Sequence, residues 1–150
     1  MKVEAETTIR RSRHEVFAAF ADIANAPQRI TGIDRVELLD DRPFGAGYRW
    51  RETRTMFGKQ VTEEMRVTQV EPGERYRVES DSRGTRYLSD VIFEDSGPSA
   101  TRVRMTFAGH PTSTAARLIA PFAFLFAGTA RKQLQRDLDD MRTSLEDAIG

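Results

Sequence analysis

The stretch KQVTEEMRVTQVEPGERYRVESDSRGTRYLSDVIF, residues 59–93, decides the fold. It contains three runs in which apolar and polar residues alternate, separated by the short breaks Glu71-Pro72-Gly73 and Ser82-Arg83-Gly84. Alternation with a period of two is typical of strands, and tight turns favour Gly, Pro and Ser. Breaks this short join antiparallel strands, because a parallel crossover needs a dozen residues or more. The stretch therefore predicts three strands of an antiparallel meander.

The same pattern extends in both directions along the chain. It predicts six consecutive strands within residues 32–111 and a seventh near the N-terminus. Ser12 and Glu15 have the spacing of a capping box, which predicts a helix after the first strand. Asn25-Ala26-Pro27 is expected to end that helix, and a second short helix follows to about Ile30. The strand candidates are residues 2–10, 34–39, 47–56, 59–70, 75–80, 85–93 and 100–108.

After residue 111 the apolar pattern changes to a helical period. Thr112-Ser113-Thr114 supplies good N-cap residues, and Pro121 predicts a kink or restart within the helical region. Apolar residues then recur at spacings of three and four, which places them on one helix face. Asp137, Asp139 and Asp140 are expected on a solvated face. The predicted apolar face consists of Phe122, Phe126, Ala130, Leu134, Leu138, Met141 and Leu145.

The run LIAPFAFLFAG, residues 118–128, is apolar on all sides and needs a partner surface. One interpretation is ordinary packing against the first helices. Others are a movable lid formed by Phe124 and Leu125 over a pocket, a contact with a lipid surface, or a contact with a second subunit. The run is too short to span a bilayer, which takes about 20 residues.

Composition narrows the class of protein. Lys plus Arg is 23 and Asp plus Glu is 23, so no global field draws the chain to nucleic acid. The absence of cysteine excludes disulfides, thiolate metal sites and cysteine nucleophiles. His14 and His110 form no metal-ligand spacing, and we expect neither a metal nor another cofactor. Residues 1–11 lack the apolar core of a secretory signal, and we expect a cytoplasmic protein, either monomer or homodimer.

Four segments of the chain resemble the SRPBCC superfamily, which includes START-like lipid-binding domains and polyketide cyclase/dehydrase-type proteins. They are IRRSRHEVF (residues 9–17), VTQVEPGER (67–75), TRVRMTF (101–107) and the amphipathic helix ending at 134–145. The resemblance covers residues 1–150 as a single domain. It implies an α+β helix-grip fold, in which a curved seven-stranded antiparallel sheet surrounds a long C-terminal helix and two short helices follow the first strand. A curved sheet and a straight helix do not pack along their whole length, so we expect a hollow between them.

The strand faces that point toward this hollow predict a ligand site. They are aromatic and apolar with a few polar groups, as small-molecule sites require. The alternative is that the same residues simply form the core. The predicted ligand-binding residues are Tyr48, Trp50, Glu52, Arg54, Glu63, Met65, Tyr76, Tyr87, Ser89, Val91, Met105, Phe107, Phe122 and Phe126.

Three charged residues share this apolar face, namely Glu52, Arg54 and Glu63. Buried charges must be paired, so Arg54 is expected to bind Glu52 or Glu63 and form a polar end to the pocket. A ligand carboxylate, phosphate or phenol would then replace one of the partners. The alternatives are a salt bridge at the sheet edge, or a bulge that turns these side chains to the other face.

These observations favour binding or transport of a small hydrophobic ligand, such as a lipid or a polyketide-like aromatic. One alternative, which the resemblance also implies, is a polyketide cyclase/aromatase-type enzyme that uses the same cavity. Its candidate acid and base groups are Tyr48, Arg54, Glu63 and Tyr87. A second alternative is a protein-interaction module on this fold. Beyond the ligand, a peripheral lipid contact is the further partner considered, with no nucleic acid and no integral membrane segment.

Overall fold

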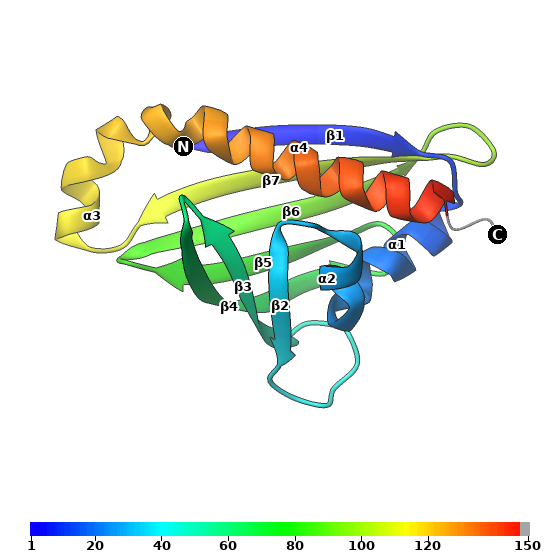
Figure 1. The fold of residues 1–150 in the computed structure, drawn as a ribbon, viewed down its shortest axis with the longest axis horizontal. Helices are drawn as coiled ribbons and strands as arrows, with labels where there is room; N and C mark the ends of the chain where they lie inside the picture. The colour runs from blue at the N-terminus through cyan, green and yellow to red at the C-terminus, as the bar shows by residue number, and fades with distance from the viewer. Residues whose placement is uncertain (148–150) are drawn as a thin grey trace.

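The computed structural model describes residues 1–147 and shows a curved sheet wrapped around one side of a long helix (Figure 1). The sheet has seven strands in the order β1-β7-β6-β5-β4-β3-β2. Every neighbouring pair is antiparallel. This confirms the predicted meander, and the N-terminal strand joins it at the edge of β7. The strands are β1 (Lys2–Ile9), β2 (Ile33–Leu38), β3 (Arg49–Met56), β4 (Lys59–Glu71), β5 (Arg75–Ser82), β6 (Thr85–Asp95) and β7 (Thr101–Pro111).

Strand burial follows the alternation of the sequence. In β1, the odd-numbered residues from Val3 to Ile9 are buried and the even-numbered ones are exposed. In β4, the register shifts between Val67 and Gln69, and this bulge returns Val70 to the concave side. Strands β6 and β7 extend beyond their predicted ends, to Asp95 and Pro111, because their ladder continues at its two ends to the pairs Asp95–Thr101 and Thr85–Pro111 after the apolar alternation has faded.

The first helix begins where the capping box predicted it. The Glu15 backbone N–H donates to Ser12 Oγ at 3.2 Å, and Ser12 Oγ donates to the Glu15 carboxylate at 3.0 Å. Helix α1 (Arg13–Ala21) is shorter than predicted and is followed by the 3₁₀ turn η1 (Ile23–Asn25) and by α2 (Ala26–Arg29). Pro27 lies in the first turn of α2. It therefore begins the second helix, where an N–H is not needed, and does not end the first.

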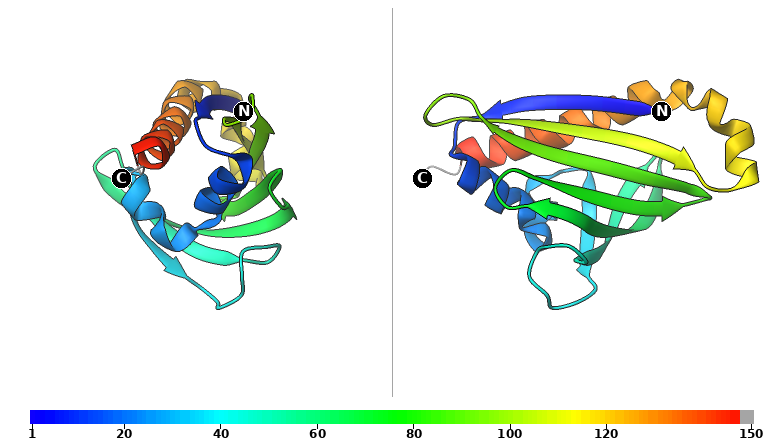
Figure 2. Two further views of the ribbon diagram at one scale, coloured as in Figure 1. Left: turned by 90° about the vertical axis from the view of Figure 1, so that its right-hand side faces the viewer. Right: turned by 180° about the vertical axis from the view of Figure 1, so that it is seen from behind.

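The C-terminal region breaks where Pro121 predicted a restart. Helix α3 (Thr114–Ile119) is capped by Ser113, and η2 (Ala120–Phe122) separates it from α4 (Phe124–Asp147). Helix α4 runs along β1 across the concave side, while α3 lies beyond the ends of β6 and β7 (Figures 1 and 2). Within residues 1–147 no helix is long and apolar enough to cross a membrane.

The buried face of α4 confirms most of the predicted stripe but not its beginning. Leu134, Leu138 and Met141 are buried, whereas Phe122 and Phe126 remain 58% and 61% exposed. The stripe runs back through Ala130 to Ala127, which pack against the core, so Phe126 lies one residue off the face. Phe122 lies in η2, the break between α3 and α4, so the helical period of α4 does not extend to it.

The remainder of the apolar run is also exposed and does not pack against the first helices. The side chains in question are Leu118, Ile119, Phe124 and Leu125. Helix α1 lies at the opposite end of the sheet (Figure 1). The packing interpretation of residues 118–128 was therefore wrong.

Candidate ligand-binding site

The concave face of the sheet collects the predicted site residues of β3 to β7, and of Tyr48 just before β3. Trp50 lies opposite Met65, and Ser89 lies between Val78 and Phe107 on the neighbouring strands. Tyr48, Trp50 and Met65 pack in one apolar cluster, and Tyr76, Val91, Met105 and Phe107 pack in another. Phe122 and Phe126 are the predicted residues that lie outside this face.

The two ends of the concave face differ in how well they are filled. Near α1, aromatic rings contact one another edge to face. The ring centroid of Phe17 lies 5.1 Å from that of Phe93 and 6.0 Å from that of Tyr76. This end is closed by side chains. Toward α3, inward-facing Met65 and Ser89 are only half-buried, as are Met105 and Phe107. Solvent therefore reaches the apolar inner face at the α3 end.

Tyr87 and Gly109 shape this open end. The Tyr87 ring stacks on Phe107 with centroids 5.2 Å apart. A Cβ at Gly109 would lie 3.2 Å from the Tyr87 ring, so the glycine lets the ring lie flat over the β7 backbone. The phenol of Tyr87 is thereby held on the inner face beside half-buried apolar side chains.

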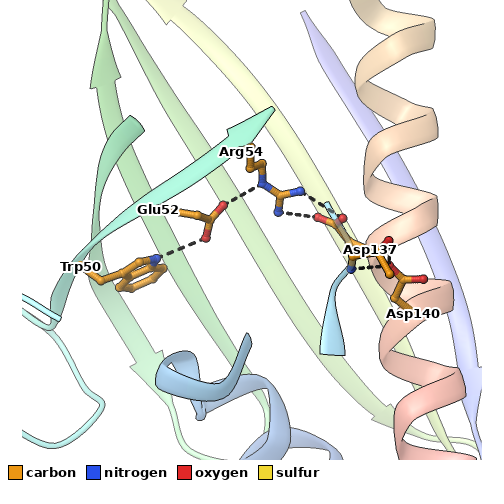
Figure 3. A network of polar contacts seen from close by, with 6 residues as sticks. Trp50, Glu52, Arg54, Asp137 and Asp140 are labelled. Carbon is orange, nitrogen blue, oxygen red and sulfur yellow. Dashed lines mark hydrogen bonds and ion pairs between the residues drawn. The ribbon is translucent and has the colours of Figure 1, made fainter. Parts of the chain in front are cut away.

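A chain of polar contacts follows the inner face of β3 and joins the sheet to α4 (Figure 3). Trp50 Nε1 donates to Glu52 Oε1 at 3.3 Å, and Arg54 Nε donates to Glu52 Oε2 at 2.9 Å. The two Nη atoms of Arg54 donate to the Asp137 carboxylate at 3.2 and 2.7 Å. Because α4 lies along the edge strand β1, this bidentate pair links that side of the curved sheet to β3, next to the opposite edge.

Because these charged groups are nearly buried, each of them is costly to leave without its partner. The side chains of Arg54, Glu52 and Asp137 are 15%, 12% and 11% exposed. Burial alone would lower the pKa of Arg54, but the carboxylates of Asp137 and Glu52 outweigh it and hold the pKa above its ordinary value. Burial raises the pKa of Asp137 above that of an exposed aspartate, against the opposing effect of Arg54. Arg54 stays charged and requires both partners.

Asp137 was predicted on a solvated face, and that prediction was wrong. It lies directly before Leu138 at the edge of the buried stripe, and Arg54 reaches it from β3. Asp140, one turn later, accepts hydrogen bonds from the backbone N–H and the hydroxyl of Thr31 at 2.9 and 2.8 Å. A signal was present in the sequence, because position 137 is three residues after Leu134 and shares its side of the helix.

Glu63 does not pair with Arg54. It lies opposite Glu52 across β3 and β4, and it accepts a hydrogen bond from Ser82 Oγ at 3.1 Å. Around Arg54, the inner side therefore carries the three carboxylates of Glu52, Glu63 and Asp137 against one guanidinium, a formal sum of −2, while Lys59 on the same face of β4 is exposed at the hairpin end. Of the two predicted partners of Arg54, Glu52 is confirmed. The second partner is Asp137 and not Glu63. Nε of Arg54 therefore donates to Glu52, and both Nη atoms donate to Asp137.

Tyr76 offers a test of how closed the α1 end is. Burial, with a smaller contribution from the charge of Glu52, raises the pKa of Tyr76 well above the ordinary 10.0. A tyrosine whose pKa is higher in the folded state loses stability as pH rises above the unfolded pKa. We therefore expect the free energy of unfolding to fall above about pH 10.

The measurement is urea denaturation between pH 8 and 11 on the wild type and on Tyr76→Phe. The variant should show a shallower decline, because one of the phenols responsible has been removed. Equal slopes in wild type and Tyr76→Phe would contradict the burial of this phenol.

Two grooves of about 340 and 540 Å³ lie elsewhere on the molecule. The first follows the bulge of β4 beside β5, and the second lies between α1 and the C-terminal part of α4. Apart from Tyr76 at the floor of the first, they involve none of the predicted site residues. The concave face, with its buried charges and open apolar end, remains the candidate site.

Several solved structures share this architecture. The Zhui aromatase/cyclase from Streptomyces sp. R1128 superposes with a TM-score of 0.78 at 13% identity, covering 100% of this chain and 96% of that one. A START superfamily protein from Mycobacterium smegmatis gives 0.76 at 12% identity, covering 97% of each chain. A protein from Thermus thermophilus gives 0.72 at 21% identity, covering 98% of this chain and 95% of that one. Identities this low establish the helix-grip fold and not the activity.

The search of curated proteins gives no match. The family model described as "Polyketide cyclase / dehydrase and lipid transport" matches residues 1–149. The match spans both the sheet and the gripping helix. The chain therefore belongs to the polyketide cyclase / dehydrase and lipid transport family.

Proposed function

We propose that the protein binds a small hydrophobic molecule between the concave face of the sheet and α4, and that this molecule is neutral and carries hydroxyl groups. The observation that carries the proposal is the half-buried apolar face around Met65, Ser89 and Phe107, together with the three carboxylates that border it. Each Å² of this apolar face that a ligand removes from water contributes about 25 cal/mol to the free energy of binding.

The charges on the concave face define the polar end of the ligand. Arg54 already donates to Glu52 and Asp137, so an incoming carboxylate or phosphate would have to displace one of them. It would also be desolvated near a formal charge of −2, which is unfavourable. A hydroxyl or phenol can instead donate to a carboxylate oxygen, in a charge-assisted hydrogen bond. We therefore expect the site to prefer hydroxylated over anionic ligands.

A matched pair of probes tests this preference. Anthracen-2-ol and anthracene-2-carboxylate have the same ring system and differ in one polar group. We expect the alcohol to bind at least about tenfold more tightly at pH 7, because like charges placed side by side are penalised. Native mass spectrometry of the protein with each probe gives the ratio and the stoichiometry, which should be one to one. Equal or tighter binding of the carboxylate would contradict the proposal.

Glu63 supports a second candidate function, catalysis by proton transfer. It is the inward carboxylate that Arg54 does not hold, and its recorded partner within residues 1–147 is the Ser82 hydroxyl. A carboxylate in that position can remove the acidic proton between two ketone groups of a β-keto chain, the step that begins ring closure. Hydrogen–deuterium exchange of benzoylacetone followed by NMR tests it. Wild type should accelerate the exchange and Glu63→Gln should not, with an unchanged free energy of unfolding in urea; no acceleration by wild type would favour simple binding.

A further inference from the structure

Large apolar side chains are exposed together where α3, η2 and α4 meet. We call residues 118–126 the apolar tip; it projects beyond the end of the sheet, on the side away from α1 (Figures 1 and 2). An exposed apolar patch of this kind marks a contact surface. Its exposed side chains are Leu118 (73%), Ile119 (68%), Phe122 (58%), Phe124 (69%), Leu125 (63%) and Phe126 (61%).

The charged residues that flank the apolar tip along the chain are all basic. The sequence has no Asp or Glu between residues 96 and 136, although the whole chain is neutral. Arg117 directly precedes the tip, and Arg131, Lys132 and Arg136 follow it along α4; all four are exposed. Within residues 1–147, none of these four side chains forms an ion pair, whereas sheet arginines such as Arg77 do. The tip therefore combines uncovered apolar surface with uncompensated positive charge.

The basic residues of α4 stand behind the apolar ones on the same side of the helix. Phe124 and Arg131 are seven residues apart, as are Leu125 and Lys132, which places each pair on one face two turns apart. Seven residues of α-helix rise about 10 Å. With the tip leading and the axis of α4 pointing into the lipid surface, apolar side chains inserted about 5–10 Å, the depth that apolar faces of interfacial helices reach, lie ahead of the basic ones. Arg131 and Lys132 would then lie at the level of the lipid phosphates.

We propose that the apolar tip docks on an anionic lipid surface, with Phe124 and Leu125 inserted and Arg131 and Lys132 bound to phosphate groups. Charge complementarity selects this occupant. In a twofold dimer the same patch would meet itself, and its uncompensated cations would face one another. Anionic lipids attract juxtamembrane Lys and Arg and also accept the apolar side chains.

The tip also lies at the open end of the concave face. The backbone N–H of Thr112, just before α3, donates to the Gly84 carbonyl at 2.7 Å, in the hairpin that carries Tyr87. Docking would place the half-buried inner face close to the lipid surface. The lipid contact needs no cavity, but its role as the source of a hydrophobic ligand rests on the proposed function.

Vesicle flotation with the full chain tests the proposal. The probes are phosphatidylcholine vesicles with and without about 30% phosphatidylserine. Wild type should float with the anionic vesicles and much less with the neutral ones. Lys132→Glu should lower the partition coefficient about tenfold or more, and Phe124→Ser/Leu125→Ser about a hundredfold. Arg35→Glu is the matched control, an exposed charge reversal on β2, and should float as wild type does.

Two results would overturn the proposal. One is that Lys132→Glu and Arg35→Glu float equally. The other is that wild type ignores both kinds of vesicle while Phe124→Ser/Leu125→Ser converts a dimer to a monomer in light scattering, which would make the tip a subunit interface. Uptake of anthracen-2-ol from water is measured alongside. A wild type that floats with anionic vesicles but takes up no anthracen-2-ol would refute the proposed function alone, and a wild type that takes up the probe without floating would refute the lipid contact alone.

Discussion

Replacing Arg54 by methionine is expected to lower the free energy of unfolding by about 3–5 kcal/mol. The substitution keeps most of the side-chain volume but removes the only positive charge between Glu52 and Asp137. Both carboxylates are nearly buried, with side chains 12% and 11% exposed. Left without a partner, each would be desolvated at full cost. The link between β3 and α4 would be lost as well.

Arg77→Met is the matched control for this substitution. Arg77 also holds a carboxylate with two hydrogen bonds, to Asp90 at 2.8 and 3.0 Å, but on the convex face. Its side chain and that of Asp90 are 33% and 32% exposed, so solvent replaces the lost contact. We expect a loss of about 0–1 kcal/mol. Urea denaturation at pH 7 gives both values, and equal losses would contradict a special role for the inner network.

A double substitution separates the cost of an unpaired charge from the value of the pair. In Arg54→Met/Asp137→Leu one of the orphaned carboxylates is replaced by an apolar side chain of similar size. Replacing buried ion pairs by apolar groups is often neutral or stabilising. The double variant should therefore be more stable than Arg54→Met alone. A double variant that is less stable would show that Asp137 has a role independent of Arg54.

Ser89→Phe is expected to weaken binding of anthracen-2-ol about a hundredfold or more. Ser89 is half-buried on the concave face, between Val78 and Phe107. A phenyl ring at this position would occupy the space that we assign to the ligand. Overpacking a filled core costs about 1–3 kcal/mol, whereas a ring added to a face that solvent reaches does not. We therefore expect loss of binding with an unchanged free energy of unfolding.

Thr106→Phe is the control for the blocking substitution. Thr106 is also half-buried and lies on the adjacent strand β7, opposite Asp90 and Glu4, on the convex face. The same ring placed there should leave the affinity for anthracen-2-ol unchanged. Isothermal titration calorimetry gives both affinities. A Ser89→Phe protein that binds as wild type does would contradict a ligand on the concave side.

The sequence predicted those parts of the fold that depend on local patterns. Alternation gave the strands from β2 to β7, the capping box at Ser12 gave the start of α1, and Pro121 gave the break before α4. These signals depend on neighbours along the chain. The resemblance of residues 9–17 and 67–75 to a known superfamily then supplied how the elements assemble, which the family match confirms.

The pairing of charges and the start of the buried helix face were harder to predict. Asp137 comes from α4 and Arg54 from β3, 83 residues apart, so no local pattern connects them. The sequence did not distinguish Glu52 from Glu63 as the partner of Arg54. The second partner, Asp137, is supplied by the three-dimensional placement of α4. Phe126 and Ala127 are adjacent, and a helix that turns about 100° per residue buries one and exposes the other.

Contacts between a bound probe and methionine methyl groups test the central claim most directly, namely that the ligand lies between the sheet and α4. The chain has five methionines, and Met65 and Met105 lie half-buried on the concave face. With ¹³C-methyl methionine and anthracen-2-ol, the account predicts intermolecular nuclear Overhauser effects at the methyl groups of Met65 and Met105. A saturating probe that shows contacts at other methyl groups but none at these two would contradict it.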